Sequence, residues 1–393
     1  MKQKIAIIIE RADVGLGGAE RSVSELAGAL GAAGYDTHIL AAKGQANAQN
    51  VHILCADTPG KRADYRIFAQ AIRKHIGENH YDIVHSVLPF DFADVYQPRG
   101  GTYAETIVRN AASYGNKFIE VWKRATGFLN LRRAELLRAE RNLCRKKDGP
   151  AIIAISQYVA EQFKKHYGVD GSRITVIPNG VEPRNVSDEQ ARHLRAQNLF
   201  QLGVKKDINP VLFLFAANNF RLKGLVCLLE ALNLLKTKRI ERPACLVVAG
   251  SDNQAAYQRL AANFNIAESV LFLGSVADMG NLLAASDVAV LPTFYDPCSR
   301  FILEAICAGK PVITTKFNGA AELFTGNRHG LVIDRPDDIE RLTDALAYFT
   351  DTTNIREASQ AIQQDNLRQR VSISRVAGQL KGFYDSLLAG RRR

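Results

Sequence analysis

Short apolar runs alternate with helical stretches along almost the whole chain, and they do so in two successive series. Strands that alternate with helices in this way form parallel sheets with helices on both faces. The sequence therefore predicts an α/β chain of two consecutive doubly wound, Rossmann-like domains. The strand candidates of the first series are KIAIII (4–9), THILAA (37–42), NVHILC (50–55), DIVHSV (82–87) and AIIAIS (151–156). Those of the second are VLFLFAA (211–217), ACLVVAG (244–250), VLFLG (270–274), VAVLP (288–292), PVITT (311–315) and GLVI (330–333).

The two series meet at RITVIPNGVEP (173–183), where Pro and Gly residues indicate a hinge. We therefore predict an N-terminal domain over 1–177, a C-terminal domain over 178–370, and a last helix over 371–393 that packs back on the first domain. Ligands of open parallel sheets bind beyond the carboxyl ends of the strands. Two such domains that face each other would bind a ligand in the cleft between them.

The chain carries no sign of secretion or membrane insertion. Its N-terminal apolar stretch, Ile5–Ile9, is too short for a signal peptide, and no apolar run reaches the ~18–20 residues of a membrane-spanning helix. The six cysteines are scattered without a C-x-x-C pair, which is typical of reduced thiols rather than of a disulfide framework or a zinc site. These features predict a cytoplasmic protein.

Positive charge gathers in one segment of this basic chain, whose net charge is +11. Residues 117–147 hold ten basic and three acidic side chains, interleaved with the apolar residues Phe118, Trp122, Phe128 and Leu129. Two interpretations remain open: a solvated helix face, or a surface that binds anionic lipid head groups or a phosphorylated acceptor. No nucleic-acid recognition module accompanies the charge, so no nucleic-acid partner is predicted.

Two acids mark the stretch YDPCSRFILEAICAGKPVITT (295–315): Asp296 precedes a helical run and Glu304 lies on it. The run between them is predominantly apolar, which indicates that both acids face something other than water. Carboxylates are good acceptors for the paired hydroxyl groups of ribose or of a sugar ring. The alternatives are a plain helix N-cap for Asp296 and a solvated or internally satisfied acid for Glu304.

The helix of this stretch has clear start and stop signals. Asp296 fits the N-cap and Pro297 the first turn, while Gly309 and Pro311 end the helix. The backbone N–H groups of Ser299, Arg300, Phe301 and Ile302 would then be unpaired. Such a helix start carries positive partial charge and predicts a phosphate-binding site.

Cations follow the first strand of the second series, in AANNFRLKGL (216–225). Lys223, with Arg221 beside it, is placed to neutralise the charge that develops on a diphosphate leaving group. The alternative is an ordinary exposed basic loop.

The first series offers weaker signals. Gly17 and Gly18 in GLGGAER let a backbone approach a ligand closely, but Glu20 stands where the dinucleotide fingerprint needs a glycine. His85 ends the strand DIVHSV, where a core role is as plausible as a functional one. No motif for metal or serine chemistry is present, so no metal ligand is predicted.

These motifs occur together in one known family. GGAER, IPNGVE, LKGL, VLFLG and LEAICAGKPVITT, with the acids at 296 and 304, resemble in order and spacing the family 4 retaining glycosyltransferases of the GT-B fold. The resemblance covers essentially the whole chain. DVYQPRGGTYAE (94–105) and the basic segment after it are similar to bacterial lipopolysaccharide core α-glucosyltransferases in particular.

The resemblance implies roles for the residues that the motifs single out. Asp296 would bind the donor sugar hydroxyls and Glu304 the ribose hydroxyls, while Lys223 and Arg221 would hold the diphosphate with the amides of 299–302. Gly17, Gly18 and the hinge-side Asn179 would contribute to the nucleotide-sugar site.

Two departures from the family pattern concern its chemistry. The family's first acid is usually Glu, whereas this chain has the shorter Asp296. Related enzymes place Asp or His where this chain has Arg99 and Gly100, so Arg99 would bind an acceptor phosphate or the original role is lost. Arg99 and His85 are therefore the expected acceptor residues.

The resemblance implies a retaining hexosyltransferase that needs no metal or other cofactor. It would move a hexose from a nucleotide diphosphate sugar, with UDP-glucose favoured, to a lipopolysaccharide-core or similar glycolipid at the inner face of the cytoplasmic membrane. The alternatives are a non-catalytic protein that binds nucleotide-sugars or anionic surfaces, and a GT-B-like sugar-nucleotide epimerase. A two-carboxylate glycosidase is disfavoured, because it needs its acids on opposite sides of the scissile bond.

Overall fold

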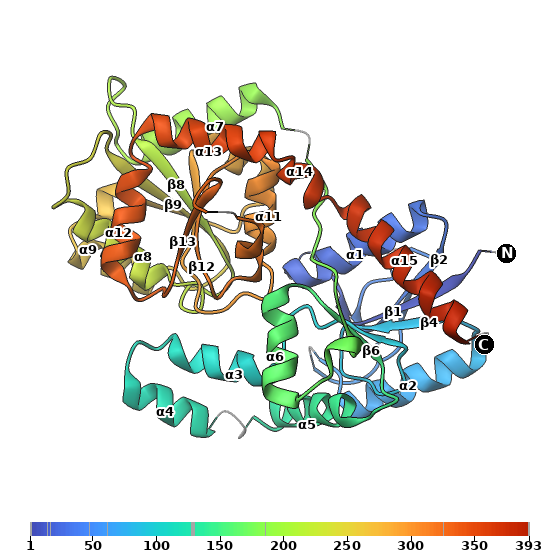
Figure 1. The fold of residues 1–393 in the computed structure, drawn as a ribbon. Coiled ribbons are helices and arrows are strands. Elements are labelled where there is room, and N and C mark those ends of the chain that lie inside the picture. The colour runs from blue at the N-terminus through green and yellow to red at the C-terminus, as the bar shows by residue number, and fades with distance from the viewer. Residues whose placement is uncertain are drawn as a thin grey trace. The chain divides into compact units, whose positions relative to one another are not determined.

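The computed structural model describes residues 2–13, 15, 17–46, 48–60, 62–126, 130–184, 186–324 and 326–391. They form two compact units, each with its own parallel sheet (Figure 1). The first unit comprises Met1–Val108, Val121–Glu182 and Ser372–Arg393, and the second comprises Arg109–Glu120 and Pro183–Val371. The division lies close to the boundaries expected at 177/178 and 370/371, but it also assigns Arg109–Glu120 to the second unit, which the sequence did not suggest.

The first unit is built on a seven-stranded sheet of order β3-β2-β1-β4-β5-β6-β7, in which all neighbouring strands are parallel. Its strands are β1 (Lys4–Ala12), β2 (Asp36–Gly44), β3 (Val51–Ile53), β4 (Ile83–Ser86), β5 (Val95–Tyr96), β6 (Ala151–Ala154) and β7 (Ile174–Val176). Its helices are α1 (Gly18–Ala32), α2 (Tyr65–Glu78), α3 (Tyr103–Ala112), α4 (Lys117–Thr126), α5 (Leu131–Arg145), α6 (Gln157–Tyr167) and α15 (Ile373–Arg391), of which α3 and α4 also contribute residues to the second unit.

The second unit has a six-stranded parallel sheet of order β10-β9-β8-β11-β12-β13. Its strands are β8 (Val211–Ala216), β9 (Ala244–Ala249), β10 (Val270–Gly274), β11 (Val288–Leu291), β12 (Val312–Thr315) and β13 (Gly330–Ile333). Its helices are α7 (Asp188–Gln201), α8 (Leu225–Leu235), α9 (Ala255–Asn263), α10 (Met279–Ala285), α11 (Arg300–Cys307), α12 (Ile339–Tyr348), α13 (Thr352–Gln364) and α14 (Leu367–Arg370). The prediction of two doubly wound, Rossmann-like domains is confirmed.

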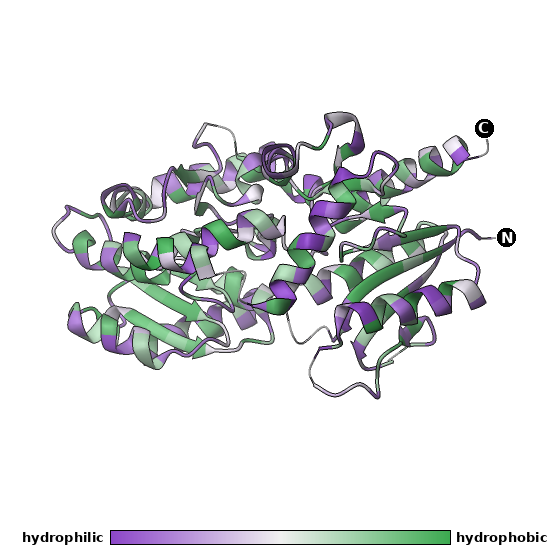
Figure 2. Cartoon of the chain, turned by 90° about the horizontal axis from the view of Figure 1, so that it is seen from below, coloured by the Kyte–Doolittle hydropathy of each residue, from purple (hydrophilic) through white to green (hydrophobic). Residues whose placement is uncertain are grey.

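Strand β1 shows why the apolar runs are continuous rather than alternating. Successive side chains of a strand point to opposite faces of the sheet. Ile5 and Ile7 pack into one core with α1 and α15, whereas Ala6 and Ile8 pack into a second core with α2. Both faces are therefore buried, and Figure 2 shows hydrophobic residues along the strands and mixed residues along the helices.

The C-terminal helix α15 belongs to the first of these cores. Its residues Val376, Leu380 and Tyr384 are buried, and the helix lies beside α1 (Figure 1). The chain returns to the first unit through a parallel bridge between Val181 and Ser372. Within the described ranges, none of the helices combines the length and apolar character that crossing a membrane requires.

The element boundaries differ from the sequence expectation at two strands of the first sheet. Strand β5 was not predicted, because only Val95 and Tyr96 pair with neighbours. Strand β7 lies inside the predicted hinge 173–183, where Ile174–Val176 pair with β6 at the edge of the sheet. Both strands are too short to produce an apolar run.

A buried carboxylate joins three helices to this sheet. Glu140 of α5 is fully buried and accepts hydrogen bonds from the hydroxyls of Tyr96 and Tyr167 and from the N–H of Tyr103 at the start of α3. Burial raises the pKa of Glu140 to about 7, although the three hydrogen bonds favour its ionised form.

This pKa makes the stability of the protein depend on pH. An acid whose pKa is higher in the folded than in the unfolded state contributes less stability as the pH rises from about 4.5 to about 7. We expect Glu140→Gln to remove this decline. Between about pH 4.5 and about pH 8, the free energy of unfolding of the variant should rise by roughly 3 kcal/mol relative to that of the wild type. Urea denaturation across this range measures the difference.

Tyr167→Phe provides the opposite case, because it removes a hydrogen bond that favours the ionised carboxylate. We expect the pKa of Glu140 to rise further in this variant, so that its stability continues to fall to a higher pH than that of the wild type. A Glu140→Gln difference that does not change with pH would show that Glu140 does not titrate in this range.

Candidate functional site

The motif 295–315 folds into the loop after β11, helix α11 and strand β12. The prediction that Asp296 caps the helix, with Pro297 in its first turn, is wrong. The helix begins at Arg300, and the hydroxyl of Ser299 accepts a hydrogen bond from the N–H of Ile302 as its N-cap. The Oδ1 of Asp296 instead accepts from the N–H of Cys298 at 3.2 Å, and its backbone pairs with Asn318 in an isolated bridge.

The first turn of α11 is more occupied than the sequence suggested. The N–H of Ser299 donates to Oδ1 of Asn318 at 3.1 Å, and that of Ile302 donates to the Ser299 hydroxyl at 3.4 Å. The expectation that all four amides of 299–302 are unpaired is therefore wrong for these two. Arg300 and Phe301 supply the remaining amides of the turn, at the positive end of the helix dipole.

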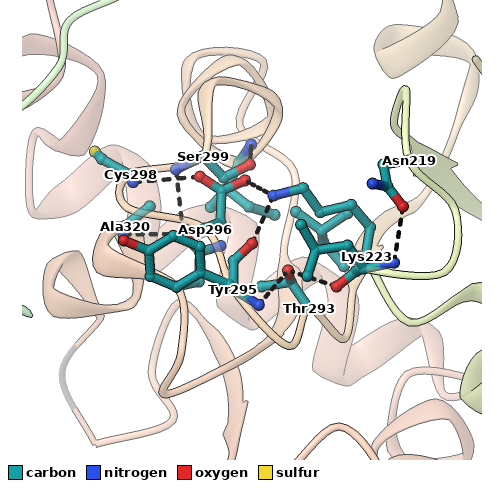
Figure 3. Close-up of polar contacts among 12 residues, drawn as sticks. Asn219, Lys223, Thr293, Tyr295, Asp296, Cys298, Ser299 and Ala320 are labelled. Atoms are coloured by element: carbon teal, nitrogen blue, oxygen red, sulfur yellow. Dashed lines mark hydrogen bonds and ion pairs between the residues drawn. The ribbon is translucent and has the colours of Figure 1, made fainter. Parts of the chain in front are cut away.

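Lys223 and Asp296 meet directly in front of this helix (Figure 3). The Lys223 ammonium donates to Oδ2 of Asp296 at 2.7 Å and to the carbonyl of Tyr295 at 2.8 Å. The two side chains are only 18% and 15% exposed, so each charge largely depends on the other for compensation. The structure thus brings together two residues that are 73 positions apart.

Gly224 is the reason that Lys223 can reach this position. It has a φ of 81°, and a Cβ atom on it would lie 2.0 Å from the carbonyl oxygen of Pro292 at the end of β11. No other residue fits such an approach without displacing the backbone. The turn 219–224 is further tied to the β11 loop by the N–H of Phe294, which donates to the carbonyl of Leu222 at 2.9 Å.

Glu304 also has an ion-pair partner. Its carboxylate accepts from Nε of Arg300 at 2.8 Å, one helical turn earlier, and both side chains are 13% exposed. Within the predominantly apolar stretch, Arg300 is therefore a charged neighbour of Glu304 at helical spacing. Neither acid of the motif is solvated.

Arg221 lies in the same turn as Lys223 but contacts a different segment. Its guanidinium donates to the carbonyl of Asn110 at 3.1 Å and to the hydroxyl of Ser113, and it stacks on the ring of Tyr114 at 3.8 Å. Its expected role with the diphosphate stays a prediction.

The remaining expected site residues belong to the first unit. Gly17 precedes α1 and Gly18 is its first residue. Arg99 donates a hydrogen bond to the side-chain oxygen of Asn179. The fold thus brings these two polar residues of the first unit together.

His85 is a core residue. It is fully buried in β4, and its Nδ1 lies 2.5 Å from the hydroxyl of Tyr384 on α15. Burial lowers the pKa of His85 to about 3, and the positive charge of Arg99 acts in the same direction. Of the two roles left open by the sequence, the structure supports the core role, because a buried imidazole offers no surface to an acceptor.

Asn318 is a site residue that the sequence did not reveal. Its side chain is almost fully buried; its Oδ1 accepts from the N–H groups of Ser299 and Ala320, and its Nδ2 donates to the hydroxyl of Thr314. Asn318 thereby ties the start of α11 to the loop after β12. The only sequence signal was a polar Asn-Gly pair soon after a strand, in TTKFNG.

In the part of the chain that the structure describes, no group of three or more His, Cys, Asp or Glu residues is arranged to hold an ion.

Both parts of the chain match models of known protein families. Residues 16–185 match the model for Glycosyltransferase Family 4, and residues 200–365 match that for Glycosyl transferases group 1. The chain is a glycosyltransferase with a Family 4 domain followed by a group 1 domain. The two matches together span most of the chain and confirm the resemblance inferred from its motifs.

Individual relatives are distant but similar over their full length. The chain is 24% identical to the lipopolysaccharide glucosyltransferase WaaG of Escherichia coli K12, over 84% of this chain and 85% of WaaG. The crystal structure of WaaG superposes with a TM-score of 0.69 at 22% identity, covering 95% of this chain and 94% of WaaG. The Anabaena protein Alr3699/HepE, solved in complex with UDP-glucose, gives a TM-score of 0.73 at 19% identity, covering 98% and 99% of the two chains. These similarities confirm the GT-B fold of this glycosyltransferase.

The buried contacts of Asn318 predict a measurable stability. Asn318→Ala leaves the N–H of Ser299, at the start of α11, and that of Ala320, in the loop after β12, without their acceptor. We therefore expect the free energy of unfolding to fall by about 2–4 kcal/mol. Gln363→Ala, at an exposed position of α13, is the control and should stay within about 0.5 kcal/mol of the wild type. Equal effects in urea denaturation would show that Asn318 does not support the loop.

Proposed function

We propose that this glycosyltransferase moves a hexose from a nucleotide diphosphate sugar, with UDP-glucose favoured, to a lipopolysaccharide-core or similar glycolipid, with retention at the anomeric carbon. The observation that carries the proposal is the largely buried Lys223–Asp296 pair in front of α11, at the carboxyl end of β11. The strand order of the second sheet reverses between β8 and β11, which is where ligands of such sheets bind. The name of the Escherichia coli relative and the UDP-glucose in the Anabaena structure support this choice of donor.

The chemistry follows from the charges at this site. Lys223 and the first-turn amides of α11 stabilise the diphosphate as it departs, because positive groups held in place before the reaction need no reorganisation during it. A leaving phosphate oxygen takes the proton of the acceptor hydroxyl. The proposal therefore requires neither an enzymic nucleophile nor a metal or other cofactor.

The two acids recognise hydroxyl groups. In the donor complex Asp296 accepts from the sugar and Glu304 from the ribose. Each carboxylate already holds a cation, Lys223 or Arg300, so its orientation is set before the ligand arrives. Lys223 can serve both the carboxylate and a phosphate, because an ammonium has three donors and, among the described residues, two of them are used.

The first unit would supply the remaining contacts. Gly17, Gly18 and Asn179 stay our proposed contributors to the nucleotide-sugar site, and Arg99 is the proposed partner of an acceptor phosphate. His85 is no longer proposed, because it is buried against Tyr384. Arg99 and Gly100 replace the Asp or His of related enzymes, which favours one alternative function, a binding protein without transfer activity.

A membrane surface is the proposed setting of the reaction. No residue of α4 is buried, and its Phe118 and Trp122 are 88% and 58% exposed beside Lys123 and Arg124. An amphipathic helix with aromatic and basic residues binds at the interface of anionic membranes. We propose that α4 binds the inner face of the cytoplasmic membrane; Phe128 and Leu129, which the sequence added to this surface, lie outside the described residues.

Lys223→Ala tests the catalytic proposal. We expect turnover with UDP-glucose to fall on the order of a hundred- to a thousandfold, as is typical when a group that stabilises developing charge is removed. Lys316→Ala is the matched control, because Lys316 is an exposed lysine of the neighbouring loop, paired only with exposed Asp334. A nearly normal rate in Lys223→Ala would contradict the assignment.

The donor and the reaction type are tested with the wild type. We expect UDP or UDP-glucose to raise the melting temperature, as any ligand that binds only the folded state does. Product analysis with donor alone separates transfer from epimerisation, since only an epimerase converts the donor into an isomeric nucleotide-sugar. Stabilisation by the donor, without any conversion even when a lipopolysaccharide-core acceptor is added, would identify the binding protein.

Trp122 gives a direct readout of membrane binding, because it is the only tryptophan of the chain. Its fluorescence should shift to shorter wavelength when vesicles of phosphatidylethanolamine and phosphatidylglycerol are added. Phe118→Ser should weaken vesicle binding about tenfold, since a large apolar side chain no longer enters the interface. Phe200→Ser, at a similarly exposed position of α7, should leave vesicle binding unchanged. Equal weakening by both substitutions would contradict the proposal that α4 binds the membrane.

A further inference from the structure

The residues around the end of α3 contact the turn that carries Lys223 and the loop after β12, which is hydrogen-bonded to Asp296. They belong to the segment Arg109–Glu120, which packs with the second unit. Two arginine–aromatic stacks make these contacts, and they differ in which partner supplies the arginine. In one, an arginine of the loop lies on an aromatic ring of the segment; in the other, an arginine of the segment lies on an aromatic ring of the loop.

The first stack supports the turn that presents Lys223. The Arg221 guanidinium lies 3.8 Å from the centre of the Tyr114 ring and donates in its own plane to the carbonyl of Asn110. Arg221 is part of the same turn as Lys223, since the N–H of Gly224 donates to the Arg221 carbonyl at 3.1 Å. A shift of Arg221 would therefore move the backbone of Lys223.

The second stack supports the loop after β12, whose backbone is hydrogen-bonded to Asp296. The Arg109 guanidinium lies 3.8 Å from the centre of the Phe317 ring. The carbonyl of Phe317 accepts from the N–H of Asp296 at 2.9 Å, and the next residue, Asn318, is bonded to the start of α11. A shift of Phe317 would therefore move both the acid and the helix start.

We propose that Arg109 and Tyr114 are positioning residues for donor binding. They hold the turn 219–224 and the loop 315–320 in the arrangement in which Lys223 and Asp296 meet at 2.7 Å. A guanidinium stacked on a ring fixes the distance and the plane of the contact while its N–H groups remain available for hydrogen bonds. The inference rests on the proposed function in one respect, namely that the Lys223–Asp296 pair binds the donor.

The test uses the full chain and two pairs of variants. Arg109→Met and Tyr114→Leu remove the stacks, whereas Arg109→Lys keeps a cation and Tyr114→Phe keeps the ring. We expect the first two to raise the Kd for UDP-glucose about five- to tenfold, in proportion to the strength of such a contact. Tyr114→Phe should stay within about twofold of the wild type and Arg109→Lys should be intermediate. Arg259→Met, at an exposed arginine of α9, is the control.

A purely structural role would lower the fraction of folded enzyme, and hence kcat, while leaving Kd and KM for the donor unchanged. That result would overturn the inference. So would equal Kd values for Tyr114→Leu and Tyr114→Phe, because the effect would then not depend on the ring.

Hydrogen exchange separates this inference from the proposed function. In the absence of nucleotide, Arg109→Met should speed amide exchange in 315–320, and Tyr114→Leu should speed it in 219–224. Unchanged exchange in both segments overturns the positioning role whether or not UDP-glucose binds. If the wild type binds neither UDP nor UDP-glucose, the proposed function fails, and the role in donor binding fails with it even where exchange increases.

Discussion

The close approach of the turn 219–224 to the end of β11 is the constraint on which the donor site depends. Gly224 meets the carbonyl of Pro292 at a distance that excludes any side chain, and this contact brings the Lys223 ammonium to Asp296. The two strands that precede these loops, β8 and β11, are neighbours although β9 and β10 lie between them in the sequence. The reversal of strand order therefore creates the site, and glycine makes it close enough for an ion pair.

Charge compensation is the second feature of the site. Asp296 is paired with Lys223, and Glu304 is paired with Arg300. Each of the four side chains has less than a fifth of its surface exposed. Partly buried charges are costly unless they are paired, so all four groups are restrained. A site that binds hydroxyls and phosphates gains from such restraint, because the orientation of its donors and acceptors is set before the ligand arrives. The shorter Asp296 does not leave a gap, because the lysine reaches it.

The two units use buried polar groups differently. In the second unit, Asn318 satisfies backbone groups around the candidate site. In the first unit, Glu140 and His85 are fully buried and bond to tyrosines from other elements, which makes them part of the architecture. A titratable residue near the end of a strand is therefore not by itself evidence of function. The burial of such a residue and its bonding partners decide between a functional and a structural role. In this protein they favour a functional role for Lys223 and a structural one for His85.

The sequence by itself determined the architecture and the position of the main motif. Two buried faces per sheet require continuous apolar runs, and parallel strands require intervening helices, so the pattern of residues was sufficient to predict both domains and most strands. The stretch 295–315 and the lysine in LKGL were visible because glycines, prolines and charges interrupt those apolar runs locally. The two-residue strand β5 was missed, since so short a strand leaves no pattern.

Only the tertiary structure decided which partners these residues have. Arg221 contacts Asn110, 111 positions earlier, and His85 contacts Tyr384, 299 positions later. The helix is capped by Ser299 and not by Asp296, whose backbone pairs with Asn318 from the next loop. Local preferences act within a few residues, whereas burial and pairing depend on segments that the fold brings together, and no local pattern contains that information.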